Sequence, residues 1–348
     1  MLLAFSKTLL LGLTAALICV WLTTPLPWMI GPLLATAMAR MAGADLRSPQ
    51  QAREAGQWVI GTALGLYFTP AVMHIVASFA PSILLAVLAA IMTGALSGWL
   101  LHRLSGVDPC TCFFAMAVGG ASEMANQGER HGALVDKVAA AHSLRIMLVV
   151  LVIPFGLRLW DVHGQDPYVQ GAKTVMLGGL LILTAATVCA ALLMRRLDVP
   201  NAWVIGPLLV ATGFTYAEIN LSTLPQAVIN TGQLLIGVSL GNRFSPGFLK
   251  TAPRYLASVA ACSVLAIVLA ATSGMALAAW SGMHTATAIL ATAPGGIAEM
   301  SLTAKTLQLG VPIVTAFHVT RMVVLVLGIG PLFVLAQRWA SFRSGRRR

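Results

Sequence analysis

The chain has 348 residues, of which 58% are hydrophobic and 9% are charged, and its mean hydropathy is +0.85. This composition leaves too little polar surface for a water-soluble globule and argues against a soluble catalytic or DNA-binding domain. The formal net charge of +11 is typical of a membrane protein whose lysines and arginines gather on the cytoplasmic face. We therefore predict an all-α polytopic membrane protein whose main partner is the lipid bilayer, with no nucleic acid partner.

Six apolar segments follow one another in the first half of the chain, beginning with one that we interpret as a retained helix rather than a signal peptide. They cover residues 7–23, 28–42, 50–69, 79–101, 110–125 and 133–158, and counterparts begin near residues 175, 201, 226, 255, 284 and 311. Segment 110–125 is too short to cross a bilayer comfortably and contains a glycine pair. We expect it and its counterpart to be re-entrant or broken segments that stop near the middle of the membrane.

Three blocks of sequence recur in the same order in both halves. WMIGPLL at 28–34 returns as WVIGPLL at 203–209, and GGASEM at 119–124 returns as GGIAEM at 295–300. The third block, GQWVIGTALGLYFTP at 56–70, returns as GQLLIGVSLGNRFSP at 232–246, with glycines spaced by four as in close helix contacts. Such self-similarity indicates a duplicated unit. We assign residues 1–172 to membrane repeat 1 and residues 173–348 to membrane repeat 2, within one integral membrane domain.

Basic residues occupy opposite connections in the two halves. The connection that begins at the end of segment 28–42 carries three arginines, whereas the corresponding connection of the second half carries Glu218 and no lysine or arginine; the three are Arg40, Arg47 and Arg53. After the third segment the basic residues lie in the second half instead, and they include Arg243 and Arg254. Because lysine and arginine prefer the cytoplasmic side, this reversal predicts opposite orientations and an odd number of crossings per unit. We expect about ten transmembrane helices in two inverted five-helix repeats, in a bacterial inner membrane, with both termini cytoplasmic.

The last segment of each unit carries a histidine and an arginine three residues apart. An arginine near the bilayer centre costs at least about 3 kcal/mol on insertion scales, so it must face a partner or water rather than lipid. Together with the helix ends freed at the glycine pairs, these residues predict a midplane site for a small anionic solute. For the histidines, ordinary helix–helix hydrogen bonding is the alternative. The predicted substrate-binding residues are Arg145, Arg321, His142, His318, Gly119, Gly120, Gly295 and Gly296.

Two glutamates, Glu123 and Glu299, follow the glycine pairs and leave two interpretations open. In one, each pairs with the arginine of its unit and holds the broken segment in place. In the other, the pair exchanges for a substrate–arginine pair and a protonated glutamate, which couples transport to a proton. The histidines form no i, i+4 pair and no His-x-His, and the five cysteines form no framework, so we expect no metal, no cofactor and no enzyme.

The blocks IGPLLAT, GGASEM and APGGIAEM, with the paired HSLR and HVTR, resemble the membrane AbrB family over nearly the whole chain. Members of that family carry labels such as ammonia monooxygenase and regulator of gene expression, whereas the soluble DNA-binding AbrB regulators share only the name. The resemblance supports the glycine pairs, Arg145 and Arg321 as site residues. The leading hypothesis is a secondary transporter of a small anionic metabolite. The alternative is an integral membrane regulator or sensor that affects gene expression through an unknown partner, and a homo-oligomer is compatible with either.

Overall fold

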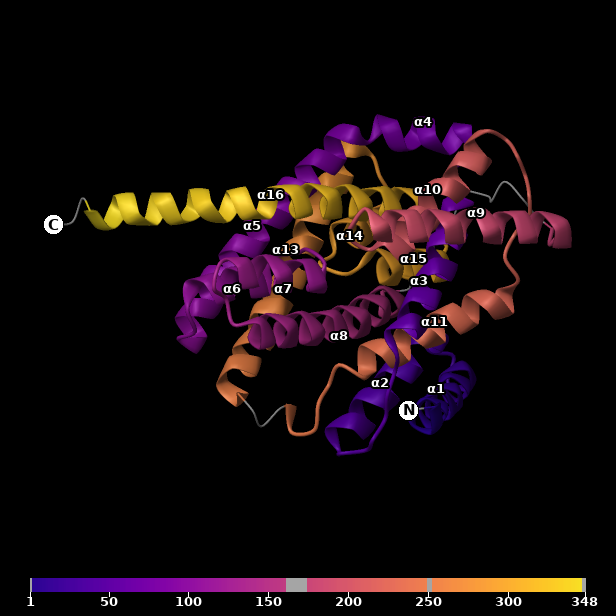
Figure 1. Cartoon of the computed structure of the whole chain (residues 1–348). Coiled ribbons are helices and arrows are strands. Elements are labelled where there is room, and N and C mark those ends of the chain that lie inside the picture. Colours follow the sequence, from indigo (N-terminus) through magenta and orange to yellow (C-terminus); the bar gives the residue numbers. More distant parts are fainter. Residues whose placement is uncertain (1, 161–173, 249–251, 346–348) are drawn as a thin grey trace.

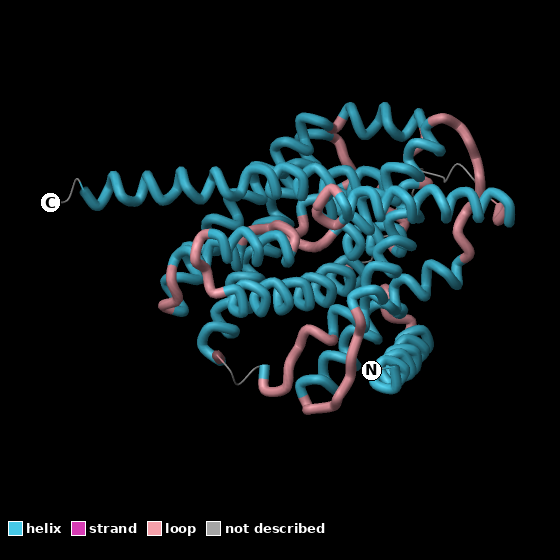
Figure 2. The backbone as a smooth tube through the Cα atoms, in the orientation of Figure 1, coloured by secondary structure: helices cyan, strands magenta, loops and turns pink. Residues whose placement is uncertain are grey.

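The computed structural model describes residues 2–160, 174–248 and 252–345, and every regular element within these ranges is a helix (Figure 1 and Figure 2). The first half contains α1 (Leu2–Trp21), α2 (Pro27–Met41), α3 (Gln50–Gly65), α4 (Pro70–Ser78), α5 (Ala80–Ser105), α6 (Pro109–Met116), α7 (Ala121–Arg130) and α8 (Val135–Leu159). The second contains α9 (Leu177–Arg196), α10 (Ala202–Tyr216), α11 (Gln226–Gly241), α13 (Pro253–Ser281), α14 (Thr285–Thr292), α15 (Ile297–Thr306) and α16 (Val311–Gly345). Corresponding helices agree in length: α2 and α10 each have 15 residues, and α6 and α14 each have 8.

Six of the described helices, α1, α5, α8, α9, α13 and α16, are long and apolar enough to cross a membrane. The bent pair of α3 and α4 raises this number to seven if it is taken as one span. The outer faces of these helices expose large apolar side chains such as Leu10, Met92 and Leu181, as expected where a surface faces lipid. The chain therefore has the character of a multi-pass membrane protein, although its long apolar helices are fewer than the predicted ten because α2, α3, α10 and α11 are short.

The helix that corresponds to the predicted segment 50–69 is shorter than expected. Helix α3 ends at Gly65, and a separate helix, α4, begins at Pro70 after a bend of 92°. The Thr69 side chain accepts a hydrogen bond from the Val72 backbone N–H at 3.4 Å, and proline occupies the first helical position. A capping threonine followed by proline starts a new helix, and this local signal explains the bend.

Close packing of short helices joins the two halves. Helix α2 packs against α11, and α3 packs against α10. A Cβ atom on Gly65 would lie 2.5 Å from the Leu208 carbonyl oxygen, and one on Gly237 would lie 2.5 Å from the Met29 carbonyl oxygen. Because only glycine permits such an approach of two backbones, the prediction that the glycines spaced by four serve packing is confirmed.

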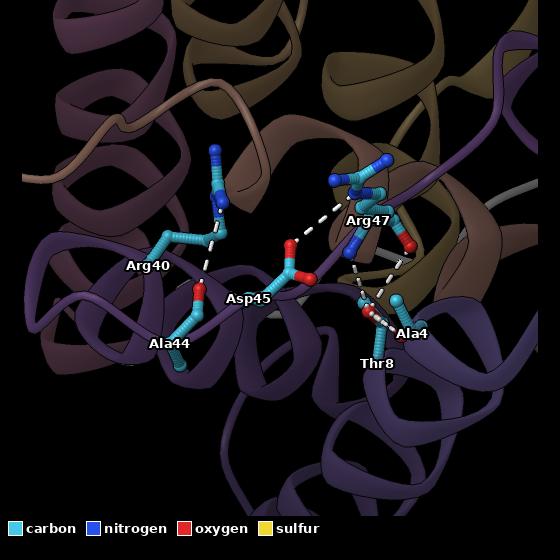
Figure 3. A network of polar contacts seen from close by, with 6 residues as sticks. All are labelled: Ala4, Thr8, Arg40, Ala44, Asp45 and Arg47. Carbon is cyan, nitrogen blue, oxygen red and sulfur yellow. Dashed lines mark hydrogen bonds and ion pairs between the residues drawn. The ribbon is translucent and has the colours of Figure 1, made fainter. Parts of the chain in front are cut away.

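The N-terminal helix is attached to the connection that follows α2 (Figure 3). The Thr8 hydroxyl lies 2.8 Å from the Ala4 carbonyl oxygen and 3.0 Å from the Arg47 carbonyl oxygen, and it accepts the Arg47 N–H at 3.1 Å. The Arg47 side chain forms an exposed ion pair of 3.2 Å with Asp45. Arg47 thus lies on the surface at a connection, as the loop-charge argument assumed.

Candidate functional site at two broken helices

The two segments that the sequence predicted to be broken are each a pair of short helices. Residues 117–120 separate α6 from α7, and residues 293–296 separate α14 from α15. Asp108 fixes the start of α6 because its carboxylate accepts the Thr111 backbone N–H at 2.8 Å, with Pro109 in the first position. Helix α6 ends at Met116, and Gly120 precedes α7 in an extended conformation. At each break, the last carbonyl groups of one helix and the first amide groups of the next have no partner within their own helix.

Arg145, on α8, holds the carbonyl end of α6. Its Nη1 donates to the carbonyl oxygens of Met116 at 3.2 Å and of Ala117 at 3.0 Å, and its Nη2 lies 3.0 Å from Nδ1 of His142. The side chain is buried, at 2% exposure. The last carbonyls of a helix lack partners within the helix and carry partial negative charge, so this cation satisfies them.

Arg321, on α16, makes the same kind of contact in the second half. It donates to the carbonyl oxygens of Ala293 at 2.6 Å and Gly295 at 2.5 Å. The Nε atoms of Arg321 and Arg145 are both buried and have no partner among the described residues. The two arginines therefore act as braces for the broken helices, and the Nε–H of each is without a partner among the described residues.

The two histidines also reach backbone carbonyls. Nε2 of His142 lies 2.9 Å from the Phe114 carbonyl oxygen, and Nε2 of His318 lies 2.8 Å from that of Leu290. Because a carbonyl can only accept, Nε2 carries the proton in both rings. These contacts are the helix–helix hydrogen bonds that the sequence left open as the alternative role.

The glutamates do not pair with the arginine braces. Glu123 and Glu299 occupy the first turn of α7 and α15, and a Cβ atom on Gly120 or Gly296 would overlap the carboxylate that folds back over it. Among the described residues neither glutamate forms an ion pair, so the interpretation in which each one pairs with its unit's arginine is wrong for this structure. A carboxylate in the first turn stabilises the positive end of a helix. Glycine precedes each glutamate because a Cβ atom at that position would overlap the carboxylate.

A cavity of about 90 Å³ lies between the two breaks. At about 10–15 Å³ per water molecule by this measure, it holds several waters or a small solute. His142 does not line it, whereas every other predicted site residue does. The lining predicted residues are Arg145, Arg321, His318, Gly119, Gly120, Gly295, Gly296, Glu123 and Glu299.

The cavity also contains polar residues that sequence reasoning missed. Arg53 and Gln57 reach it from α3, and Asn201 reaches it from the start of α10. We counted Arg53 as a loop charge, but α3 begins at Gln50 and places Arg53 in its first turn, one turn before Gln57. That spacing of four was the available signal, because residues four apart share a helix face.

Arg243 follows α11, which ends at Gly241, so it lies in the connection predicted from the sequence, and it lines a second cavity. This second cavity shares Ala121 with the cavity that Arg53, Glu123 and Glu299 line. Neither Arg53 nor Arg243 forms a side-chain hydrogen bond or ion pair with another described residue. At the offset of 176, Ile229 corresponds to Arg53 and Tyr67 corresponds to Arg243, so the internal repeat gave no signal for either arginine.

The amino-acid sequence is similar to one protein family and to two named proteins. The family model described as "Transition state regulatory protein AbrB" matches residues 28–337, which include both helix breaks. The chain is 28% identical over 335 residues to "Uncharacterized protein YhjN" of Bacillus subtilis (strain 168), covering 88% of this chain and 86% of that one. It is 26% identical over 303 residues to "Putative regulator AbrB" of Escherichia coli (strain K12), covering 86% of each.

Proposed function

This chain belongs to the AbrB family, and we propose that it is a secondary transporter, rather than an enzyme, of a small anionic metabolite that binds between the two helix breaks. The observation that carries the proposal is the cavity itself, which is lined by Arg53, Arg145 and Arg321 and by two glutamates. Ionisable groups inside a membrane domain are costly and are retained where a solute or ion passes. Discontinuous helices that meet beside such groups are the usual binding elements of secondary transporters.

We propose that residues 1–172 and 173–348 are inverted units that together cross the membrane about ten times. Two contacts between corresponding parts support this. The Nε atom of Arg254, at the start of α13, donates to the Leu104 carbonyl oxygen at 3.1 Å, near the end of α5. These corresponding helices thus pack antiparallel, as a two-fold axis in the membrane plane requires. A Cβ atom on Gly56 would lie 2.7 Å from the carbonyl oxygen of Gly232, its counterpart, so these residues lie near such an axis.

The orientation proposed from the loop charges places both termini in the cytoplasm of a bacterial cell, with the chain in its inner membrane. Arg47 and Arg195 then face the cytoplasm, and His74 and Glu218 face the opposite side. Each unit presents its broken helices from a different side, so rocking of the units against each other gives the cavity access to one side at a time.

Glu123 and Glu299 are the proposed proton carriers. Both line the cavity together with Arg53, Arg145 and Arg321. When an anion occupies these arginines, the carboxylates lose their favourable interaction with positive charge, and a proton then binds them more readily. Transport of the anion is thereby coupled to a proton in the same direction.

Uptake by the full chain in proteoliposomes tests this proposal. Radiolabelled organic anions are offered with and without an inward proton gradient, and protein-free vesicles give the background. We expect uptake of at least one anion that rises with the gradient. An absence of anion uptake and of anion binding across a broad panel would refute the transporter function.

A membrane regulator is the second candidate because one relative carries the name of a regulator. In that case the same cavity senses a solute and passes the change to a partner or to a second copy of the chain. The two functions separate in a variant that binds the solute but no longer transports it. A regulatory effect that survives in such a variant would favour the sensor.

A further inference from the structure

The two helix breaks are each electrically balanced. In the first, Arg145 lies at the negative end of α6 and Glu123 lies at the positive end of α7. The formal charges of the two side chains sum to zero although they form no ion pair, and the opposite partial charges of the two helix ends also sum to zero. Arg321 and Glu299 repeat this balance in the second break. The residues that recur in the sequence therefore contribute no net charge to the site.

With Arg53 and Arg243 the site has four arginines against two glutamates, so two positive charges are in excess. Arg53 lines the cavity between the breaks, and Arg243 lines a larger neighbouring cavity of about 730 Å³ that shares Ala121 with the first. The other charged residues on this larger cavity, Asp136 and Lys137, balance each other. Two guanidinium groups on adjoining cavities repel each other, and an anion between them offsets that repulsion. The junction of the two cavities thus has a net charge of about +2 by this count.

The arginine braces are poorly placed to bind a carboxylate with two parallel N–H groups. The Nη groups of Arg145 already donate to two carbonyls and to a histidine, and those of Arg321 donate to two carbonyls. Bidentate binding of a carboxylate uses two parallel N–H groups on one edge of the fork. Each brace can offer such an edge only through its free Nε–H and an Nη2 that already contacts His142 or the Gly295 carbonyl. Arg53 and Arg243 have no hydrogen-bond partner among the described residues.

We propose that Arg53 and Arg243 bind the substrate directly, and that the substrate is a small dicarboxylate with one carboxylate on each arginine. This inference rests on the proposed transporter function and names its substrate class. A charge of −2 neutralises the two arginines, and each guanidinium matches one carboxylate in a bidentate pair. A molecule with a carboxylate at each end also suits two arginines that line different but adjoining cavities.

Calorimetric titration of the purified full chain tests the inference with three probes: succinate, butyrate and sulfate. Butyrate has the same carbon number as succinate but a single carboxylate, and sulfate is a compact dianion. We expect succinate to bind the native chain about 30-fold or more tightly than either, because losing one buried charge pair costs about 2–5 kcal/mol. Arg53→Gln and Arg243→Gln should each lower the affinity for succinate by about 30-fold and leave that for butyrate nearly unchanged.

Two further variants distinguish a loss of substrate binding from a loss of folding. Arg196→Gln removes an exposed arginine at the end of α9 and should bind all probes as the native chain does. Arg53→Lys keeps the charge but loses the fork, so it should bind more weakly and still prefer succinate over butyrate. A damaged fold cannot produce a selective change of preference, so the ratio of the two affinities separates substrate binding from stability.

The outcomes distinguish this inference from the proposed function. If the native chain binds succinate and the Arg53 and Arg243 variants keep its affinity and preference, the inference is wrong and the transporter function stands. Tighter binding of sulfate than of succinate overturns the dicarboxylate assignment. If no anion binds the native chain and none is taken up by proteoliposomes, the proposed function fails and the inference fails with it.

Discussion

Replacing Gly237 by alanine tests the contact that joins the two halves of the protein. The added Cβ atom would lie 2.5 Å from the Met29 carbonyl oxygen of α2. Since the obstacle is backbone, no side-chain rotation relieves the overlap, and α2 and α11 must separate by roughly 1 Å. Overpacking of this kind costs about 1–3 kcal/mol.

The same substitution has an opposing, purely local effect. Alanine in place of glycine inside a helix stabilises it by about 0.5–1 kcal/mol. Gly213→Ala is the matched control, because it lies inside α10 and nothing approaches within 4 Å of an added Cβ atom there. The propensity gain is common to both variants, so their difference isolates the packing cost of about 1–3 kcal/mol.

Thermal unfolding in one detergent, followed by intrinsic fluorescence, measures this difference. At roughly 2 °C per kcal/mol, we expect Gly237→Ala to unfold about 2–6 °C below Gly213→Ala. Because α11 leads directly to Arg243, succinate should also bind Gly237→Ala more weakly. Equal unfolding temperatures for the two variants would contradict the close approach of α2 and α11 and the interpretation of the glycine spacing.

Arg145→Lys should keep membrane insertion but lower the unfolding temperature, since one ammonium cannot take the places of both Nη1, which holds two carbonyls, and Nη2, which contacts His142. An active Arg145→Met/Glu123→Leu variant would show that the balanced pair is dispensable. Glu123→Gln and Glu299→Gln should retain anion binding and lose the response of uptake to a proton gradient, and a preserved response would remove these residues from the coupling. In single-cysteine labelling from outside the cell, positions near Glu218 should react and those near Arg47 should not; labelling of both from the same side would contradict the inverted units.

Several features were predictable because they depend on local chemistry. The apolar composition and segment lengths predicted a helical membrane protein, and the glycine pairs at 119–120 and 295–296 predicted where helices break. The spacing of His142 and Arg145 placed them on one face of a helix, which agrees with their 3.0 Å contact. Glycines four apart indicated helix contacts for the same reason, because helical periodicity is a property of the chain itself.

Only the tertiary structure decided which groups meet at the site. Periodicity gives the face on which Arg145 lies but not its partner, and that partner is the Ala117 carbonyl, 28 residues away in sequence, rather than Glu123. In the same way, the sequence placed Arg53 and Arg243 in separate connections, whereas the packing of α3 against α11 brings them to two adjoining cavities. The sequence by itself thus determined the membrane character and the position of the breaks. The charge of the site came from tertiary packing, because a side chain's electrostatic surroundings depend on elements that lie far apart along the chain.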